Sequence, residues 1–148
     1  MPAGLRVGVN QALFYNSATY GTPTWVEITA AIDVTLGLDK SEATVKARLS
    51  TWEQTLPAMK TLSIGWNMIA DTSLTPYNVM RDAFINDTLM DLAVCDDAAI
   101  ATVGADYFRS ETYLYQFQVK QGLEEAETVD VMAKRAYSTN APAWTDVS

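Results

Sequence analysis

The residues that most often carry out chemistry in proteins are scarce in this chain. Its 148 residues include no histidine and a single cysteine, Cys95. The usual general base is therefore missing, and so are Ser-His-Asp triads, Cys-His pairs and most catalytic zinc sites. The seven glycines fit neither G-x-G-x-x-G nor G-x-x-x-x-G-K-[ST], the patterns that cradle phosphate. Cys95 adjoins an apolar run, so we expect a buried structural thiol.

Carboxylates are the remaining candidates for catalysis, because glycoside hydrolysis needs only two of them at a defined separation. The candidates are Asp96, Asp97, Glu124, Glu125, Glu127 and Asp130. All are expected at turns or on the water-facing side of strands, where solvated charge is the simpler interpretation. Asp96 and Asp97 also lack the regular ligand spacing of a calcium loop. A carboxylate-based hydrolase is therefore a third hypothesis, and no catalytic, cofactor-binding or metal-binding residue is assigned.

The chain is acidic, with a formal net charge of −8 and a pI near 4.3. Affinity for nucleic acid depends mainly on Lys and Arg residues that neutralise phosphates, so a groove that grips DNA is not expected. No apolar run approaches the ~18 residues of a membrane helix. Residues 1–6 lack the basic and apolar regions of a signal peptide. We therefore expect a soluble protein that is made in the cytosol.

Any functional side chains must be positioned mainly by β-strands, because a two-residue alternation of apolar and polar side chains dominates the chain. Over residues 26–36 all even positions are apolar and most odd positions are polar. The alternation returns at residues 62–68, 113–119 and 129–133. Since successive side chains of a strand point to opposite faces, each run predicts a strand with one buried and one hydrated face. This investment in sheet favours a protein that assembles or binds.

The predicted elements follow from these runs and from the turn residues between them. Strands are predicted over residues 6–15, 25–36, 42–49, 60–68, 89–94, 111–121 and 126–137. A turn at 37–40 would join the second and third strands into a hairpin, and 50–58 would be a polar link. One helix is predicted over 76–86, capped by Ser73 or Thr75, with Pro76 in its first turn. Tyr77, Met80 and Phe84 would form its sheet-facing stripe.

These elements predict a mainly β protein, an antiparallel β-sandwich or partial barrel with one flanking α-helix. The length of 148 residues fits one domain over residues 1–148. Residues 138–148 contain Pro142 but no periodicity, so we expect an extended C-terminal tail.

The order of these elements resembles the tail tube protein, or major tail protein, of long-tailed bacteriophages. A tryptophan opens a long strand at Trp25, and a polar segment ends in the sequence LPAMK at residues 56–60 before the strand LSIGW at 62–66. A single helix, a short strand and a closing hairpin over 113–135 follow. The likeness covers most of residues 5–137 and is one of pattern and order.

The resemblance implies a β-sandwich or partial barrel with a flanking helix, in which six copies close into a ring and rings stack into a hollow tube. Such a tube is a conduit for genome delivery. The resemblance thus implies no enzymatic activity, no cofactor and no membrane. The expected partners are further copies of the chain, other tail proteins and DNA that passes without specific binding. The expected location is the virion tail, after synthesis in the host cytoplasm.

The hydrated strand faces supply candidate residues for the channel, or lumen, of such a tube. They are Glu42, Thr44, Lys46, Arg48, Gln116, Gln118, Thr128 and Asp130. An acidic wall would let DNA slide, although Lys46 and Arg48 weaken that expectation locally. The expected contacts between subunits are Trp52, Leu56 and Trp144, which lie in segments with little periodicity.

The alternative from a different class is a β-sandwich binding module, such as a capsid-decoration or carbohydrate-binding domain. In that case Trp52, Tyr20 and Trp144 would contact a ligand or partner.

Overall fold

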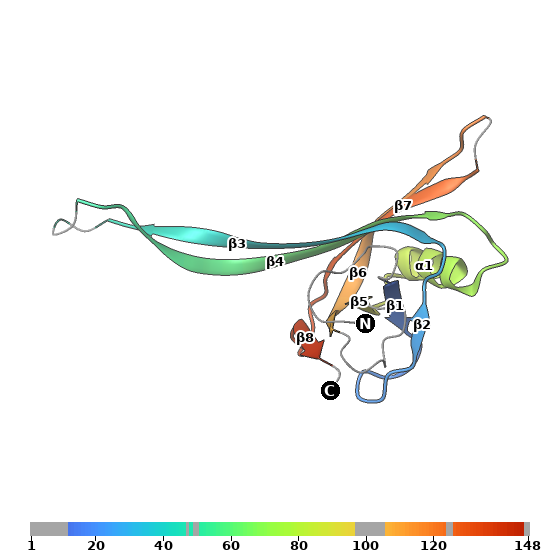
Figure 1. The fold of residues 1–148 in the computed structure, drawn as a ribbon, viewed down its shortest axis with the longest axis horizontal. Coiled ribbons are helices and arrows are strands. Elements are labelled where there is room, and N and C mark those ends of the chain that lie inside the picture. The colour runs from blue at the N-terminus through green and yellow to red at the C-terminus, as the bar shows by residue number, and fades with distance from the viewer. Residues whose placement is uncertain (1–11, 47, 49–50, 97–105, 124–125, 147–148) are drawn as a thin grey trace.

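The computed structural model describes residues 12–46, 48, 51–96, 106–123 and 126–146, which form eight strands and one helix (Figure 1). In chain order the elements are β1 (Ala12–Asn16), β2 (Trp25–Glu27), β3 (Ala31–Val45), β4 (Gln54–Ile69), α1 (Thr75–Asn86), β5 (Met90–Cys95), β6 (Asp106–Lys120), β7 (Thr128–Arg135) and β8 (Ala143–Asp146). All the strand pairs are antiparallel. The predicted mainly β fold with one flanking helix is confirmed.

The strands form one sheet that curls into a partial barrel. Its order is β2-β1-β5-β6-β7-β4-β3, and β8 pairs with the first residues of β6. The two end strands, β2 and β3, are separated in the chain only by residues 28–30. The backbone N–H of Ile28 donates to the carbonyl of Leu13 on β1 at 2.8 Å, and the carbonyl of Ala30 accepts from Ile69 on β4 at 3.4 Å. This link holds the two ends of the sheet close together without closing it by strand pairing.

The strand that we predicted over residues 25–36 is therefore two strands. β2 pairs with β1, whereas β3 pairs with β4 from Ala31 onward. Alternation predicts which side chains are buried, but it carries no information about a change of strand partner. The buried side chain of Ile28 keeps the alternation intact across the break.

The predicted turn at residues 37–40 is wrong, because β3 continues through it to Val45. Gly37 pairs with Ser63 and Lys40 with Lys60 on β4. A Cβ on Gly37 would lie 2.8 Å from the Ser63 hydroxyl oxygen, so this glycine allows a close approach of the two strands and does not make a turn. The first half of the segment predicted as a separate strand over 42–49 is thus the end of β3, which stops at Val45. The predicted polar link at 50–58 contains the first residues of β4.

The helix is confirmed, although its predicted cap is not. α1 begins after Leu74, which makes no side-chain capping bond, with a proline in the first turn. Ser73 instead donates its backbone N–H and its hydroxyl to Asp71, at 2.9 and 2.6 Å. The predicted sheet-facing stripe packs on Phe117 of β6, with ring centroids 5.8 Å away for Tyr77 and 6.1 Å for Phe84.

The main core lies between α1 and the concave side of the curled sheet. The predicted alternation on β4 places four side chains in it, Leu62, Ile64, Trp66 and Met68. β7 adds the inward-facing Val129, Val131 and Ala133. A smaller cluster on the opposite face of β1 and β5 contains Phe14, Ala93 and Cys95. Cys95 is a buried thiol, as predicted.

Three more predicted strands are confirmed, with shifted ends. The strand predicted at 89–94 is β5, and the strands of the predicted closing hairpin are β6, which starts at Asp106 and not at residue 111, and β7. β1 starts at Ala12 in the described part of the chain, and the rest of the strand predicted from residue 6 lies outside it. Within the expected C-terminal tail, Ala143–Asp146 forms β8, which the sequence did not predict.

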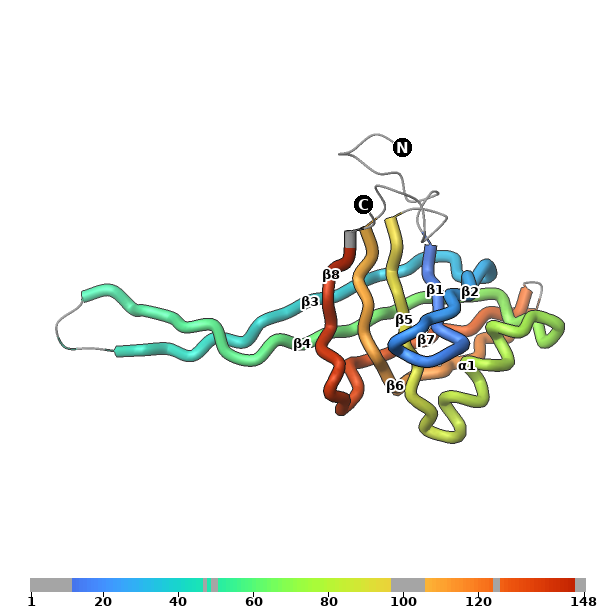
Figure 2. The backbone as a smooth tube through the Cα atoms, turned by 90° about the horizontal axis from the view of Figure 1, so that it is seen from below, coloured from blue at the N-terminus to red at the C-terminus, as the bar shows by residue number. Residues whose placement is uncertain are grey.

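The molecule consists of a body and one long arm. We define the arm as residues 38–61, the outer parts of β3 and β4 with their connection. Figures 1 and 2 show the arm projecting from the body on one side, whereas α1 and the tip of the β6–β7 hairpin lie toward the other side.

Candidate assembly surfaces

The arm is a two-stranded ribbon that its own chain leaves uncovered. Every described residue from 38 to 61 is exposed. Large apolar side chains are among them, including Met59 at 78% and Leu56 at 58% of their full exposure. An isolated two-stranded ribbon is marginally stable in water, and exposed apolar patches are typical of interaction surfaces. The arm therefore has the properties of a segment that packs on another molecule.

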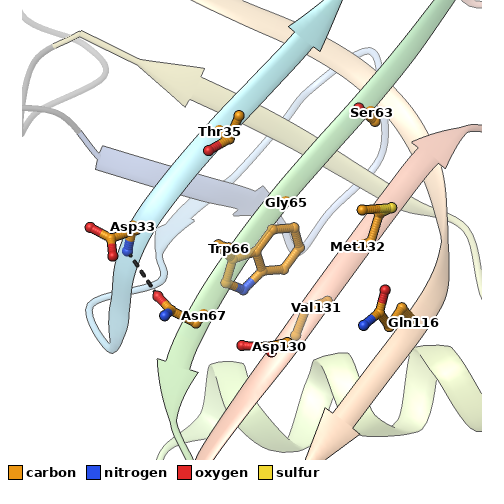
Figure 3. Close-up of a pocket in the computed structure, with 10 residues that line it drawn as sticks. All are labelled: Asp33, Thr35, Ser63, Gly65, Trp66, Asn67, Gln116, Asp130, Val131 and Met132. Carbon is orange, nitrogen blue, oxygen red and sulfur yellow. Dashed lines mark hydrogen bonds between the residues drawn. The ribbon is translucent and has the colours of Figure 1, made fainter.

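A second surface is the outer face, which we define as the side of β3, β4, β7 and β6 that points away from the core. It contains a shallow hollow whose lining residues are drawn in Figure 3. The outward side chains there are small or polar, namely Asp33, Thr35, Ser63, Asn67, Gln116, Asp130 and the single apolar Met132. Asn67 Oδ1 accepts the backbone N–H of Asp33 at 3.1 Å. Lys120 Nζ lies 2.6 Å from Asp130 Oδ2. This face is hydrated and carries carboxylates.

The residues that we expected to line one channel fall into two separate groups. Gln116, Gln118, Thr128 and Asp130 share the outer face, because their strands pair Gln118 with Asp130 and Lys120 with Thr128. Glu42 and Thr44 lie on β3 within the arm, and Lys46 and Arg48 follow in the connection to β4, away from that face. The split follows from the hairpin, which is longer than predicted and carries the second group out of the body.

The three residues that we expected at contacts between subunits are all exposed. Trp52 lies in the connection at the end of the arm and is 81% exposed, and Leu56 lies nearby on β4. Trp144 on β8 is 64% exposed and touches Phe108 edge to face, with ring centroids 5.1 Å apart. Their role in assembly stays a prediction.

A cationic groove lies where the arm meets β8, and the sequence did not reveal it. We call it the basal groove; the residues that characterise it are Leu38, Lys40, Lys60, Arg135 and Trp144. Lys40 and Lys60 stand directly opposite each other on β3 and β4, a placement that costs stability because like charges repel. Asp39 is the acidic residue among the described lining residues. The correct strand register would have shown the facing lysines, but the misplaced turn concealed it.

An acidic hollow lies where the partial barrel stays open, between β1 and the beginning of β3. We call it the seam. Its buried floor includes Leu13 and Ile28. Glu27 and Asp33 are exposed at it, and Asp33 also borders the outer face, where the two surfaces meet. Ile32, in the irregular stretch of β3 between Ala31 and Val34, is exposed beside them. No lysine or arginine is among the described residues that line the seam.

A buried ion pair fixes the loop that connects β1 and β2. Arg109 Nη2 donates to Asp91 Oδ2 at 2.6 Å and to the Tyr20 carbonyl at 2.7 Å. Its guanidinium carbon lies 3.6 Å from the Tyr20 ring centroid and 5.0 Å from that of Trp25. Burial alone lowers the pKa of Arg109, but the hydrogen bonds and the charge of Asp91 raise it by more. The Tyr20 ring thus packs on Arg109 within the chain, and its contact with a ligand stays a prediction of the alternative hypothesis.

The carboxylates considered for catalysis do not converge in the described part of the chain. Asp96 Oδ1 accepts the backbone N–H of Asp106 at 2.8 Å, and Asp130 pairs with Lys120 on another strand pair. Asp97, Glu124 and Glu125 lie outside the described residues. Among described residues there is no cluster of three or more His, Cys, Asp or Glu that could hold a metal ion. The described chain also has no helix that is both long and apolar enough to span a membrane.

No family model matches the sequence, and a comparison with curated protein sequences gives no significant match. The fold, however, matches solved tail structures. The tail of an empty gene transfer agent (GTA) particle, computed with C6 symmetry, has a TM-score of 0.75 and 12% identity, covering 95% of this chain and 99% of that chain. The native GTA virion gives a TM-score of 0.73 at 10% identity, with the same coverage of 95% and 99%.

The SPP1 tail tube gives a TM-score of 0.69 at 14% identity, covering 88% of this chain and 75% of that chain. At these identities the likeness is one of fold. The fold that the sequence resemblance implied is therefore confirmed, and this chain has the fold of phage tail-tube structures.

Proposed function

We propose that this chain is the repeating subunit of a phage-like tail tube. Six copies close into a ring, rings stack, and the resulting channel delivers the genome. The subunit is a structural protein without enzymatic activity or cofactor. Its partners are other copies of itself, other tail proteins and passing DNA, and it does not engage a membrane. It is made in the host cytoplasm and resides in the virion tail.

The observation that carries this proposal is the arm. Its described residues from 38 to 61 are all exposed, although its strands pair over their whole length. A ribbon of this kind receives little stabilising packing from its own chain. We therefore infer that it packs on a neighbouring copy. The exposed Leu56 and Met59 supply the apolar area that such a contact needs. The fold shared with the GTA and SPP1 tail structures supports the same conclusion.

The outer face is suited to line the channel. The side chains that line its hollow are mostly polar and hydrated, with Met132 as the apolar one. Of its lysines, Lys120 is neutralised by Asp130, and Lys134 lies over the Tyr115 ring, 5.9 Å from its centroid. DNA is held by clusters of unpaired Lys and Arg through counterion release, so a wall with few free cations holds it weakly. The acidic net charge of −8 agrees with this use.

Removing the arm tests the proposal. Residues 42–57 are replaced by Asn-Gly, which joins Ser41 to Ala58 through a two-residue hairpin turn. We expect the shortened chain to fold, because the deleted residues contribute nothing to either buried cluster. It should remain monomeric by light scattering, whereas the full chain forms rings or tubes that are visible by negative-stain electron microscopy.

The full chain is the decisive control in this experiment. A full chain that stays monomeric at high concentration, or forms only a trimer, contradicts the tube and favours a binding or decoration module. If tubes form equally well without residues 42–57, the proposed tube remains supported, but the arm is not needed for its assembly.

A further inference from the structure

The basal groove and the seam carry opposite charges on opposite sides of the body. The groove is lined by Lys40, Lys60 and Arg135, against one acidic residue, Asp39. None of the three cations has an ion pair within the described chain. The seam presents Glu27 and Asp33 without any described cation among its lining residues. Each surface therefore carries charge that its own chain leaves unbalanced.

The two surfaces also match in shape. Trp144 lies at the groove, is 64% exposed and packs edge to face with Phe108, with ring centroids 5.1 Å apart. The seam is a hollow with apolar walls that include Leu13, Ile28 and Val94. A bulky aromatic residue surrounded by cations on one surface thus faces an apolar hollow with an acidic rim on the other. Tryptophan in such a position is the commonest kind of energetic anchor at protein interfaces.

One copy cannot bring these surfaces together. β8, which carries Trp144, and β2, which borders the seam, lie on opposite sides of the body in both views (Figures 1 and 2). The contact must therefore join two copies head to tail. A head-to-tail contact repeats from copy to copy and closes into a ring when its rotation permits.

We propose that Trp144 of one copy inserts into the seam of the next copy, with the cations of the basal groove placed against Glu27 and Asp33. This inference rests on the proposed assembly into rings and names the contact between neighbours within a ring. The inserted side chain covers the opening that the partial barrel leaves between its two end strands. The facing Lys40 and Lys60 gain the counter-charges that their own chain lacks.

Charge reversal in two separate chains tests the contact. The seam variant carries Glu27→Lys and Asp33→Lys, and the groove variant carries Lys40→Glu and Lys60→Glu. In the first variant both surfaces are basic, and in the second both are acidic. Each variant alone should need at least about tenfold more protein than the native chain to form rings, because like charges then meet at every contact.

An equimolar mixture of the two variants should recover assembly to within about threefold of the native chain. In the mixture each basic surface meets an acidic one, and the two kinds of copy alternate around an even-numbered ring. The control mixture pairs a labelled seam variant with Lys46→Glu and Arg48→Glu, which change the same charges in the arm. That second chain keeps both native surfaces and forms rings alone, so the labelled seam variant should be absent from these rings, whereas it should enter those of the rescue mixture. Rescue would also show that both variants fold.

Trp144→Ala provides a second test of the contact. We expect this variant to lose assembly while the unfolding temperature of the subunit stays unchanged.

The outcomes separate the contact from the assembly as a whole. If the native chain forms rings but the mixture assembles no better than its components, the contact is wrong and the ring assembly stands. If the groove variant assembles normally and loses only retention of DNA, the cations serve the phosphate backbone, and the inference is overturned. If the native chain remains monomeric, the contact and the proposed function fail together.

Discussion

Among the described residues, the buried Asp91 and the largely buried Arg109 form an ion pair through hydrogen bonds from two guanidinium nitrogens. Arg109 Nε and Nη2 lie 2.9 and 2.6 Å from Asp91 Oδ2. Asn16 Nδ2 donates to the same oxygen at 3.2 Å. The pair fixes the loop between β1 and β2 through the Tyr20 carbonyl, and that loop leads directly into the border of the seam. A local ion pair thus holds the border of the surface that the proposed ring contact uses.

Arg109→Met should destabilise the subunit by about 3 kcal/mol, because it leaves the buried Asp91 carboxylate without its partner. Asp91→Asn combined with Arg109→Met should cost less than Arg109→Met alone, since no buried charge then remains. Urea unfolding of the monomeric arm-deleted chain measures both values. A double variant that is less stable than Arg109→Met would mean that the unpaired charge is not the main cost.

Two glycines on neighbouring strands of the outer face should respond differently to alanine. A Cβ on Gly65 would have only the Val131 carbonyl near it, at 3.9 Å, whereas one on Gly37 would lie 2.8 Å from the Ser63 hydroxyl. Gly65→Ala should therefore raise the free energy of unfolding by about 0.5 kcal/mol, because alanine reduces the conformational entropy of the unfolded chain. Gly37→Ala should raise it only when Ser63→Ala is also present. Equal effects at the two positions in the native background would contradict the close approach.

Among the elements, the sequence predicted best those whose hydrophobic period is long and uninterrupted. The core, β4 and α1 were predicted from two patterns, because burial follows the period of the backbone. They are the alternation of Leu62, Ile64, Trp66 and Met68 and the helical stripe that begins at Tyr77. The break at Ile28 and the course of β3 past Gly37 could not be found in this way. They depend on which strand pairs with which, and on how closely two strands approach.

The assembly surfaces were predictable only in part, for the same reason. Trp52 and Trp144 stood out as large apolar residues outside any periodic run. The basal groove was missed because Lys40 and Lys60 meet only in the observed register, and Arg135 joins them from β7. β8 was missed because four residues give too short a pattern to recognise.

At the end of the arm, Trp52→Ala should impair assembly more than folding. Its side chain is 81% exposed, so we expect the free energy of unfolding of the subunit to change by at most about 0.5 kcal/mol. Trp66→Ala, in the core, should by contrast cost about 3–5 kcal/mol. Thermal unfolding and the yield of tubes measure the two effects. A strong loss of subunit stability with intact tubes would place Trp52 in the core.

At the end of α1, Asp87→Gly should stabilise the subunit by about 0.5–1 kcal/mol. Asp87 has a φ of 52° in the left-handed region, and Thr88 donates to the Ala83 carbonyl at 3.0 Å to end the helix. Glycine adopts this conformation without cost, and the change removes a carboxylate from the negative end of the helix dipole. Asp87→Asn, which removes only the charge, should give the smaller gain. A loss of stability in Asp87→Gly would contradict this account of the helix end.

For the whole molecule, charge and shape act together. In the proposed tube, the acidic residues of the outer face would repel DNA, while the unpaired cations of the basal groove and the carboxylates of the seam would meet between copies. An acidic protein can therefore associate with itself and still leave a channel that does not bind phosphate. The division of charge between surfaces matters more here than the net charge.

Placing cations on the outer face should make assembled tubes retain DNA. Gln118→Lys combined with Asp130→Lys adds basic residues beside Lys120, and neither position lies in the arm, the basal groove or the seam. We expect tubes to form and DNA to sediment with them at low salt, with release as salt rises. Gln118→Asn with Asp130→Asn is the control and should not retain DNA. Variant tubes that never hold DNA would show that this face does not line the channel.

The central claim is that copies of this chain form a hollow tube whose channel is lined by the outer face of β3, β4, β7 and β6. Electron cryomicroscopy of the purified, assembled protein tests it most directly. The account predicts stacked six-membered rings, with Gln116, Gln118 and Asp130 facing the channel and each arm packed on a neighbouring copy. A reconstruction in which those side chains are buried between subunits, or a protein that forms no tube at any concentration, would contradict it.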